Sequence, residues 1–336
     1  MNVRRQHIPG IAVAAATALA LGTVSACAGD SEAASGNSDK IDVVASFYPM
    51  AFLAEQIGKD HVNVTSLTGP GQEPHDLEIS TKQRAELEEA DAALYLRGLQ
   101  PAVDEAVTQS DIKTKIDAAT LTKLEDHGNV EHEHGSEGEA GHAEEGHSEE
   151  PHAEEPGHSE EEHALDPHVW LDPVKYSEVA EGVGKALEKA DPDNASDYKK
   201  NTEALVKKLG DLNTSFEDGL KNSRTKVFFT NHAAFGYLAE RYGLTQEAIS
   251  GLDPESEPSP ARIKELQAEA KADGVTTVFY ETLVSDKTAK TLADDAKLKT
   301  DVLDPLEGIT DKSRGDDYFQ VMEANLKALQ TALGAK

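Results

Sequence analysis

The chain has 336 residues, and its 63 acidic against 32 basic side chains give a formal net charge of -31. Without a basic stripe, this balance argues against a nucleic acid as partner, because phosphate binding needs the opposite sign. A strongly negative surface instead raises the local concentration of cations. The single cysteine, Cys27, excludes an intrachain disulfide framework.

Residues 1–26 have the pattern of an export signal, with two arginines ahead of an apolar run from Ile11 to Val24 that is too short to span a bilayer. Small residues precede Cys27 and resemble the bacterial lipobox, so we expect cleavage before Cys27 and its acylation. An ordinary secretory signal with an incidental cysteine is the alternative. Small and acidic residues over 27–40 predict a flexible tether to the outer face of the cell membrane.

Beyond the tether, short β-rich runs alternate with helical stretches, which predicts α/β architecture. The alternation occurs twice, and we expect two similar α/β lobes at 41–192 and 223–336. Between them, 193–222 has few helix breakers and an apolar repeat in steps of three and four residues. This pattern predicts a linker helix of about 40 Å that joins the lobes as a rigid strut. A helix packed wholly within one lobe is the alternative.

In the first lobe, the runs IDVVASFY, VNVTSLT and ALYLRG predict strands. A helix is expected to open at Pro49, since proline is best tolerated in the first helical turn. Another should start at Ser80, whose spacing to Gln83 fits a capping box.

In the second lobe, KVFFT, VTTVFYE and TDVLDPL predict strands. A helix is expected from His232 to Tyr242, ended by Gly243. A further helix should open at Ser259 and Pro260.

One segment interrupts the first lobe, at 124–164. It contains many Glu and Gly but almost no large apolar side chain, so we expect a disordered loop. Its histidines lie at positions 127, 132, 134, 142, 147, 152, 158 and 163. Clustered His and Glu can gather zinc weakly, and a solvated acidic spacer is the alternative.

Four short motifs, centred on His75, His168, His232 and Glu281, are expected just past the ends of predicted strands, where α/β folds place function. A lone histidine is usually a hydrogen-bonded structural residue. Here, however, three histidines outside the signal, the acidic loop and the Lys59-Asp60-His61 segment all fall at such positions. Three imidazoles with one carboxylate or water form a tetrahedral zinc site.

The motifs EPHDLEIS, DPHVWLDP, TNHAAFGYLAERYGL, DPESEPSPARI, FYE and VLDPLEG, in this order, resemble the metal-binding substrate-binding proteins of bacterial ABC importers. The resemblance is to the cluster A-I family, and particularly to its zinc branch. It implies two α/β lobes joined by a long rigid helix, with metal held in the cleft between them. His75 and His168 would come from the first lobe, and His232 and Glu281 from the second.

The resemblance also implies the metal and the partners. Manganese members are expected to carry a carboxylate in place of His232, so three histidines favour Zn²⁺ over Mn²⁺. We choose Glu281 as fourth ligand, although Asp304 or water could complete the shell, and Asp304 could instead orient a histidine or open the turn at Pro305. Trp170 should pack beside His168, because indole offers no ligand atom. The expected partners are a membrane permease and its ATPase, with the protein itself a monomer.

Two other classes remain open. A zinc hydrolase could use three histidines and an open fourth position, although no H-E-x-x-H or nucleophile-elbow motif is present. A surface adhesin with a structural metal has only composition in its favour.

Overall fold

In the computed structural model, the described residues are 40–127 and 165–335. Cys27, the export signal, nearly all of the tether and most of the His-rich segment therefore lie outside the described residues. Among the described residues, no helix combines the length and apolar character needed to cross a membrane.

The first lobe is built on a parallel sheet whose strands lie in the order β2-β1-β3-β4. The strands are β1 (Ile41–Ala45), β2 (Val62–Ser66), β3 (Ala92–Tyr95) and β4 (Thr114–Asp117). The three strands predicted here from sequence correspond to β1, β2 and β3, whereas β4 was missed. The sequence of β4, Thr-Lys-Ile-Asp, offers only one large apolar side chain and so gives little strand signal.

The second lobe repeats this topology with a parallel sheet in the order β6-β5-β7-β8. Its strands are β5 (Val227–Thr230), β6 (Thr245–Ala248), β7 (Thr277–Tyr280) and β8 (Lys299–Val302). Each sheet therefore has the second strand at one edge and the first strand beside it. The prediction of two similar α/β lobes is confirmed.

The capping signals in the first lobe act as the sequence suggests. Helix α1 (Tyr48–Gly58) has Pro49 in its first turn. Helix α2 (Thr81–Glu89) begins with the capping box between Ser80 and Gln83. The lobe also contains α3 (Pro101–Gln109).

In the second lobe, one helix is shorter than predicted. Helix α6 spans Gly236–Arg241 and begins four residues after His232. The backbone cannot start the helix earlier because the carbonyl of His232 accepts from Thr230 and Gln246, and the amide of Ala233 donates to the carbonyl of Gly251. Gly243, at a φ of 62°, ends the helical segment as expected.

Helix α7 (Pro260–Ala272) is capped by the side chain of Ser259, which accepts from the amide of Arg262. Helix α8 (Lys287–Ala296) completes the outer layer of this lobe.

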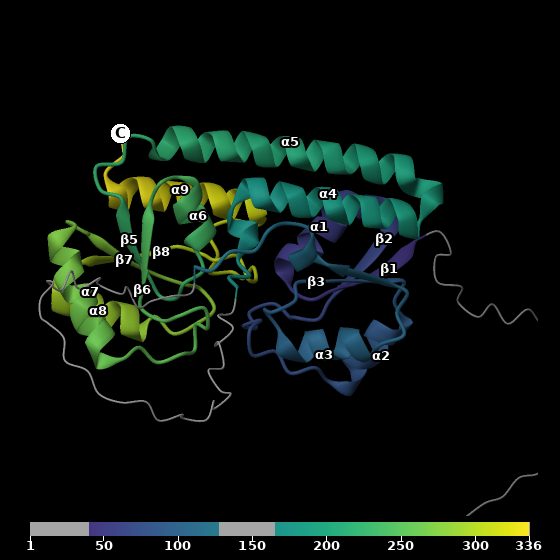
Figure 1. Ribbon diagram of the computed structural model, residues 1–336, viewed down its shortest axis with the longest axis horizontal. Helices are drawn as coiled ribbons and strands as arrows, with labels where there is room; N and C mark the ends of the chain where they lie inside the picture. Colours follow the sequence, from purple (N-terminus) through teal and green to yellow (C-terminus); the bar gives the residue numbers. More distant parts are fainter. Residues whose placement is uncertain (1–39, 128–164, 336) are drawn as a thin grey trace, which may run out of the picture. The chain divides into compact units, whose positions relative to one another are not determined.

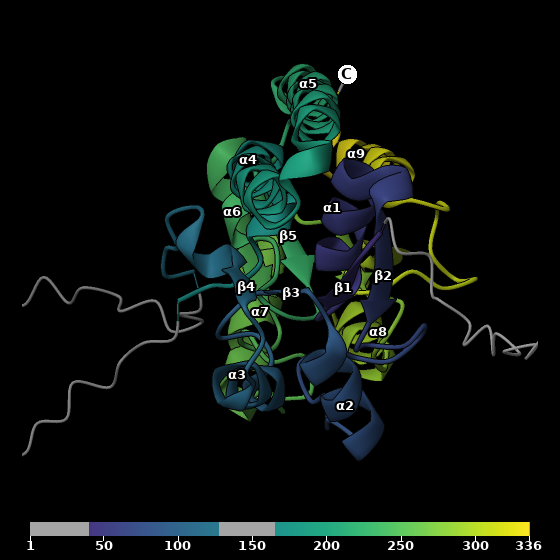
Figure 2. The same ribbon diagram turned by 90° about the vertical axis from the view of Figure 1, so that its right-hand side faces the viewer.

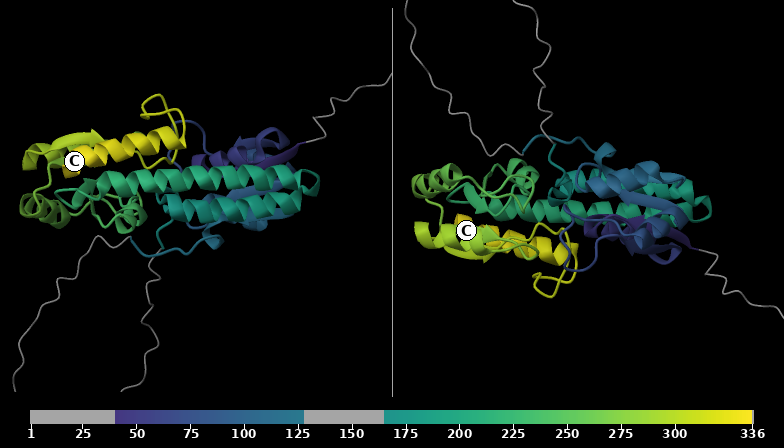
Figure 3. Two further views of the ribbon diagram at one scale, coloured as in Figure 1. Left: turned by 90° about the horizontal axis from the view of Figure 1, so that it is seen from above. Right: turned by 90° about the horizontal axis from the view of Figure 1, so that it is seen from below.

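Three long helices lie along one side of the two sheets: α4 (Pro173–Ala190) over the first, α9 (Tyr318–Leu333) over the second, and α5 (Ala195–Leu220) over both (Figure 1). Figure 1 shows α5 running past both sheets, and Figure 3 shows it beside α4. Helix α5 contacts α1 and α4 beside the first sheet and α9 at the second. Because α5 contacts helices of both lobes, it is not packed wholly within one of them.

A single apolar core extends through both lobes. It includes Phe52 of α1, Phe216 of α5, Phe228 of β5 and Tyr318 of α9. Figure 2 shows the helices α1, α4 and α9 between α5 and the two sheets, and the helices α2, α3, α7 and α8 on the other side of the sheets. Two smaller clusters fill the spaces under these outer helices. Because burial of apolar surface stabilises the folded state, the shared core fixes the lobes against each other.

Candidate metal centre

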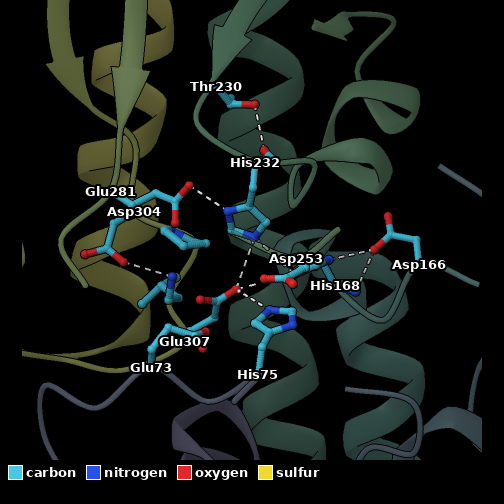
Figure 4. Close-up of polar contacts among 12 residues, drawn as sticks. Glu73, His75, Asp166, His168, Thr230, His232, Asp253, Glu281, Asp304 and Glu307 are labelled. Carbon is cyan, nitrogen blue, oxygen red and sulfur yellow. Dashed lines mark hydrogen bonds and ion pairs between the residues drawn. The ribbon is translucent and has the colours of Figure 1, made fainter. Parts of the chain in front are cut away.

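His75 reaches the centre from the loop between β2 and α2. Its side chain is 11% exposed, and its Nε2 lies 3.3 Å from Oε1 of Glu307. The neighbouring Glu73 accepts a hydrogen bond from the amide of Asp76, while its Oε1 is buried without a partner. Burial raises the pKa of Glu73, His75 lowers it and Glu307 raises it further. The carboxylate of Glu73, in addition to that of Glu307, therefore lies close to His75 (Figure 4).

His168 precedes a short turn of 3₁₀ helix, Val169–Leu171, that leads into α4. Oδ1 of Asp166 accepts from the backbone amide of His168 at 2.9 Å and from its Nδ1 at 2.8 Å. This hydrogen bond fixes the ring and turns Nε2 toward the centre. The ring of Trp170 lies 5.1 Å from that of His168, consistent with packing beside it. From the sequence, His168 is expected just past the end of a strand. In the structure no strand directly precedes His168, which lies four residues after the 124–164 segment.

His232 lies just past the end of β5. Thr230 and Gln246 hold its backbone carbonyl, and its Nδ1 donates to Oε1 of Glu281 at 2.6 Å. As at His168, a carboxylate on Nδ1 leaves Nε2 directed at the centre. The ring centroids of His168 and His232 lie 5.2 Å apart, and their Nε2 atoms are 3.4 Å from each other.

Glu307 completes the group and comes from the loop that follows β8. The turn before it is held by Asp304, whose Oδ1 accepts from the amide of Leu306 at 2.9 Å, with Leu306 at a φ of 59°. Such left-handed backbone costs about 1–3 kcal/mol for a non-glycine residue, and the buried contacts of Leu306 offset it. The turn aims the fully buried Glu307 carboxylate at the three histidines (Figure 4).

The four candidate ligand atoms lie close enough together to surround one metal ion. Oε1 of Glu307 lies 3.3 Å from Nε2 of His75, 3.3 Å from that of His168 and 3.4 Å from that of His232. All four atoms lie within 4.8 Å of one another. In a tetrahedral zinc site with bonds of about 2.0–2.1 Å, neighbouring ligands are about 3.3 Å apart. The residues therefore fit a zinc ion.

The electrostatics of the group suit exchange of protons for a cation. Burial opposes the charged form of His168, but hydrogen bonds to Asp166 and Glu307 outweigh it and raise its pKa. Burial also opposes the charged form of His232, whose pKa is nevertheless raised well above its ordinary value by Glu281 and Glu307. Burial tends to raise the pKa of Glu307, but hydrogen bonds from the histidines lower it well below its ordinary value. A divalent cation would satisfy the same carboxylate in place of these protons.

The structure changes the choice of fourth ligand. Glu281, chosen from the sequence, lies behind His232 on the Nδ1 side, whereas Glu307 faces all three Nε2 atoms. Asp304 also lies outside the group. It holds the turn through Leu306 and accepts from Thr282, so it has the turn-opening role considered as an alternative. Sequence reasoning missed Glu307, although it lies in the motif VLDPLEG that carried the resemblance.

Two parallel-sheet lobes, a long connecting helix and a buried cluster of three histidines with one carboxylate define a class, the two-lobed α/β proteins with a candidate metal centre between their lobes. The particular family is clear from comparison with known proteins. The chain belongs to the ZnuA family, because the family model described as "Zinc-uptake complex component A periplasmic" matches residues 43–332.

Two relatives of the chain carry names that refer to zinc. The chain is 37% identical over 301 residues to the zinc-binding lipoprotein AdcA of Streptococcus pneumoniae (strain R6), with 87% of this chain and 55% of AdcA covered. It is 36% identical over 321 residues to the high-affinity zinc uptake system protein ZnuA of Bacillus subtilis, with 93% and 94% covered. The chain thus spans about half the length of the first of these relatives (55%).

A solved structure shows the same fold. The Zn(II)-bound ZnuA-like domain of AdcA from Streptococcus pneumoniae superposes with a TM-score of 0.68 at 34% identity. The match covers 88% of this chain and 99% of that domain.

Proposed function

We propose that this protein is the extracytoplasmic substrate-binding component of an ABC importer, which captures Zn²⁺ between its lobes and delivers it to a membrane permease. The observation that carries the proposal is the convergence of three histidine Nε2 atoms on one buried carboxylate oxygen, at the spacing of a tetrahedral zinc shell. Membership of the ZnuA family and the names of AdcA and of the Bacillus subtilis protein support the same metal.

His75, His168, His232 and Glu307 would hold the cargo ion. Glu281 and Asp166 would hold the rings of His232 and His168 through their Nδ1 atoms. Three imidazoles and a single carboxylate favour zinc over manganese, which prefers oxygen ligands. A fourth protein ligand also argues against a zinc hydrolase, because such enzymes keep that position open for water.

The ends of the chain complete the proposal. Residues 1–26 would be removed as a signal, and acylated Cys27 with the 27–40 tether would anchor a monomer to the outer face of the membrane. The lobes would comprise 41–192 and 223–336, with 193–222 as the linker between them. The name of AdcA as a lipoprotein supports this anchoring.

Competition with a zinc chelator tests the site. The double variant His75→Ala/His232→Ala should lose tight zinc binding, because two of four ligands are removed. His61→Ala is the matched control, since His61 pairs with Asp197 away from the centre. Tight binding that persists in the double variant would disprove the site.

The role is tested in cells. A strain that lacks this protein should grow poorly when zinc is limiting, and added zinc should restore growth. If the deletion strain grew as well as wild type at limiting zinc, the import role would be contradicted, while the proposed metal site would not be affected.

A further inference from the structure

The His168 turn, residues 166–172, leads into α4 of the first lobe but is hydrogen-bonded to the second. At its start, the hydroxyl of Tyr237 on α6 donates to the carbonyl of Asp166 at 2.8 Å. At its end, the side chain of Asp172 is bound by another residue of α6. One helix of the second lobe thus holds both ends of this turn.

That residue is Arg241, which binds Asp172 through two nitrogens. Its Nε lies 3.1 Å from Oδ1 and 2.9 Å from Oδ2 of Asp172, and its Nη2 lies 2.7 Å from Oδ2. A planar guanidinium that bonds a carboxylate in this way fixes orientation as well as distance. The side chain of Asp172 is 1% exposed, so water can hardly replace Arg241 as its partner. The pair therefore fixes the end of the turn on α6.

Short backbone bonds connect this pair to His168. Oδ1 of Asp172 also accepts from the amide of Val174 at 2.9 Å and so caps α4. The amide of Asp172 donates to the carbonyl of Val169 at 3.3 Å, and the amide of Leu171 donates to the carbonyl of His168 at 3.2 Å. A displacement of Asp172 would therefore be passed through one turn of backbone to the imidazole.

The middle of the turn is also hydrogen-bonded to the second lobe. Nε1 of Trp170 donates to the carbonyl of Pro305 at 2.6 Å, and the hydroxyl of Tyr318 donates to the carbonyl of Trp170 at 2.6 Å. Pro305 lies two residues before Glu307, so the turn that carries His168 contacts the loop that carries the carboxylate of the centre. These bonds set His168 and Glu307 relative to each other.

The apolar contacts of the turn, in contrast, are shared between the lobes. Val169, Trp170 and Leu171 belong to the core that extends through both lobes, and the ring of Trp170 lies 5.0 Å from that of Phe47 in the first lobe. Apolar burial is non-directional, whereas a hydrogen bond requires a specific geometry. The polar contacts with the second lobe therefore set the direction of the imidazole.

His75 differs from the other three candidate ligands. His232 and Glu307 come from the second lobe, and the polar contacts above tie His168 to that lobe. His75 comes from the first lobe, and its side chain is 11% exposed while those of the other three are fully buried. The second lobe thus presents three ligands as a unit, and the first lobe adds the fourth.

We propose that Arg241 is a positioning residue of the metal centre, which through Asp172 holds the His168 turn on the second lobe and so keeps His168 aligned with His232 and Glu307. The inference rests on the proposed function, because it concerns the same centre. Since Arg241 acts through the turn, its effect on zinc should appear only while His168 is a ligand.

Zinc is the probe, the full processed chain is the protein, and affinity is measured by competition with chelators of graded strength. Arg241→Gln is made alone, together with His168→Ala and together with His75→Ala. Arg262→Gln is the matched control, because Arg262 is also bonded to a buried carboxylate of the second lobe, that of Glu247 at 2.7 Å, but lies on α7 and not on α6. Thermal unfolding without zinc shows whether each variant is folded.

We expect Arg241→Gln to lower zinc affinity about 10-fold, at the lower end of the range for residues behind a ligand. The same loss should appear in the His75→Ala background but not in His168→Ala, where the ring that Arg241 positions is absent. Arg262→Gln should keep wild-type affinity. With Co²⁺ in place of zinc, the visible absorption of Arg241→Gln should shift toward that of His168→Ala, because it reports the geometry of the ligands.

Unchanged affinity of Arg241→Gln overturns the inference. An equal loss in the His168→Ala background or in Arg262→Gln also overturns it, since the effect would then be one of general stability. If Arg241→Gln does not fold, Arg241→Lys is compared in the same backgrounds against the same outcomes, because lysine keeps the charge but has no planar fork for the two oxygens of Asp172. A His168→Ala variant that binds zinc as tightly as wild type would instead contradict the proposed function.

Discussion

The assignment of the two buried glutamates makes a quantitative prediction. Glu281→Gln removes a charge 2.6 Å from Nδ1 of His232 but leaves an amide oxygen that can still accept the same hydrogen bond. Mutation of such an outer partner typically lowers metal affinity 10–100-fold, or about 1.4–2.7 kcal/mol. Glu307→Gln removes the charge that faces all three Nε2 atoms. We expect its zinc affinity to fall by more than about 100-fold, because an anionic ligand in a buried site is only weakly screened.

The assay is competition with a chromophoric zinc chelator at fixed pH, for both variants and for Glu255→Gln. Glu255 is an exposed glutamate of the second lobe and serves as the control for loss of one charge. Thermal unfolding without zinc shows whether each variant is folded. A larger loss in Glu281→Gln than in Glu307→Gln would refute the geometric argument and restore Glu281 as the ligand chosen from the sequence.

Three further predictions concern pH, the interrupting segment and the contact between lobes. Zinc must displace protons from His168 and His232, whose pKa values are raised. Zinc affinity should therefore be higher at pH 7.5 than at pH 5.5. As the pH is lowered, the loss of affinity should begin at a pH above 6.5, the ordinary pKa of a histidine. Deletion of 128–164, closed by a short linker, should leave the affinity of the tight centre unchanged, because its ligands lie outside that segment. Trp170→Phe removes the hydrogen bond that Nε1 donates to the carbonyl of Pro305 at 2.6 Å and should lower the free energy of unfolding by about 1–3 kcal/mol, as measured by urea denaturation.

Each of these predictions has a clear contradictory outcome. Equal zinc affinities at the two pH values would argue against imidazole ligands. Loss of tight binding on deletion would place a ligand within 128–164. Unchanged stability of Trp170→Phe would show that the buried carbonyl of Pro305 finds another donor, and Tyr176→Phe, which also loses one buried hydrogen bond to a carbonyl, provides the comparison.

The fold followed from the sequence where local signals and tertiary packing agree. The apolar repeat of α5 and the capping box at Ser80 are local patterns, and the structure satisfies both. The start of α6 did not follow, because Gln246 from the neighbouring strand β6 holds the carbonyl of His232 in a non-helical turn. That contact joins residues fourteen positions apart and leaves no mark in a helical pattern.

The three histidines of the candidate centre could be found from their positions at strand exits and loop ends, but its carboxylate could not. Glu281 directly follows β7 and so carries the expected signal, whereas Glu307 lies five residues past the end of β8. Its position depends on the left-handed turn at Leu306 and on Trp170, which donates to the carbonyl of Pro305 from the other lobe. Strand position brings a carboxylate to the edge of the sheet, and the path of the loop then decides whether it meets Nε2 or Nδ1 of a histidine. Since only the Nε2 side faces the centre, this difference separates the candidate ligand Glu307 from Glu281, which lies against Nδ1 of His232.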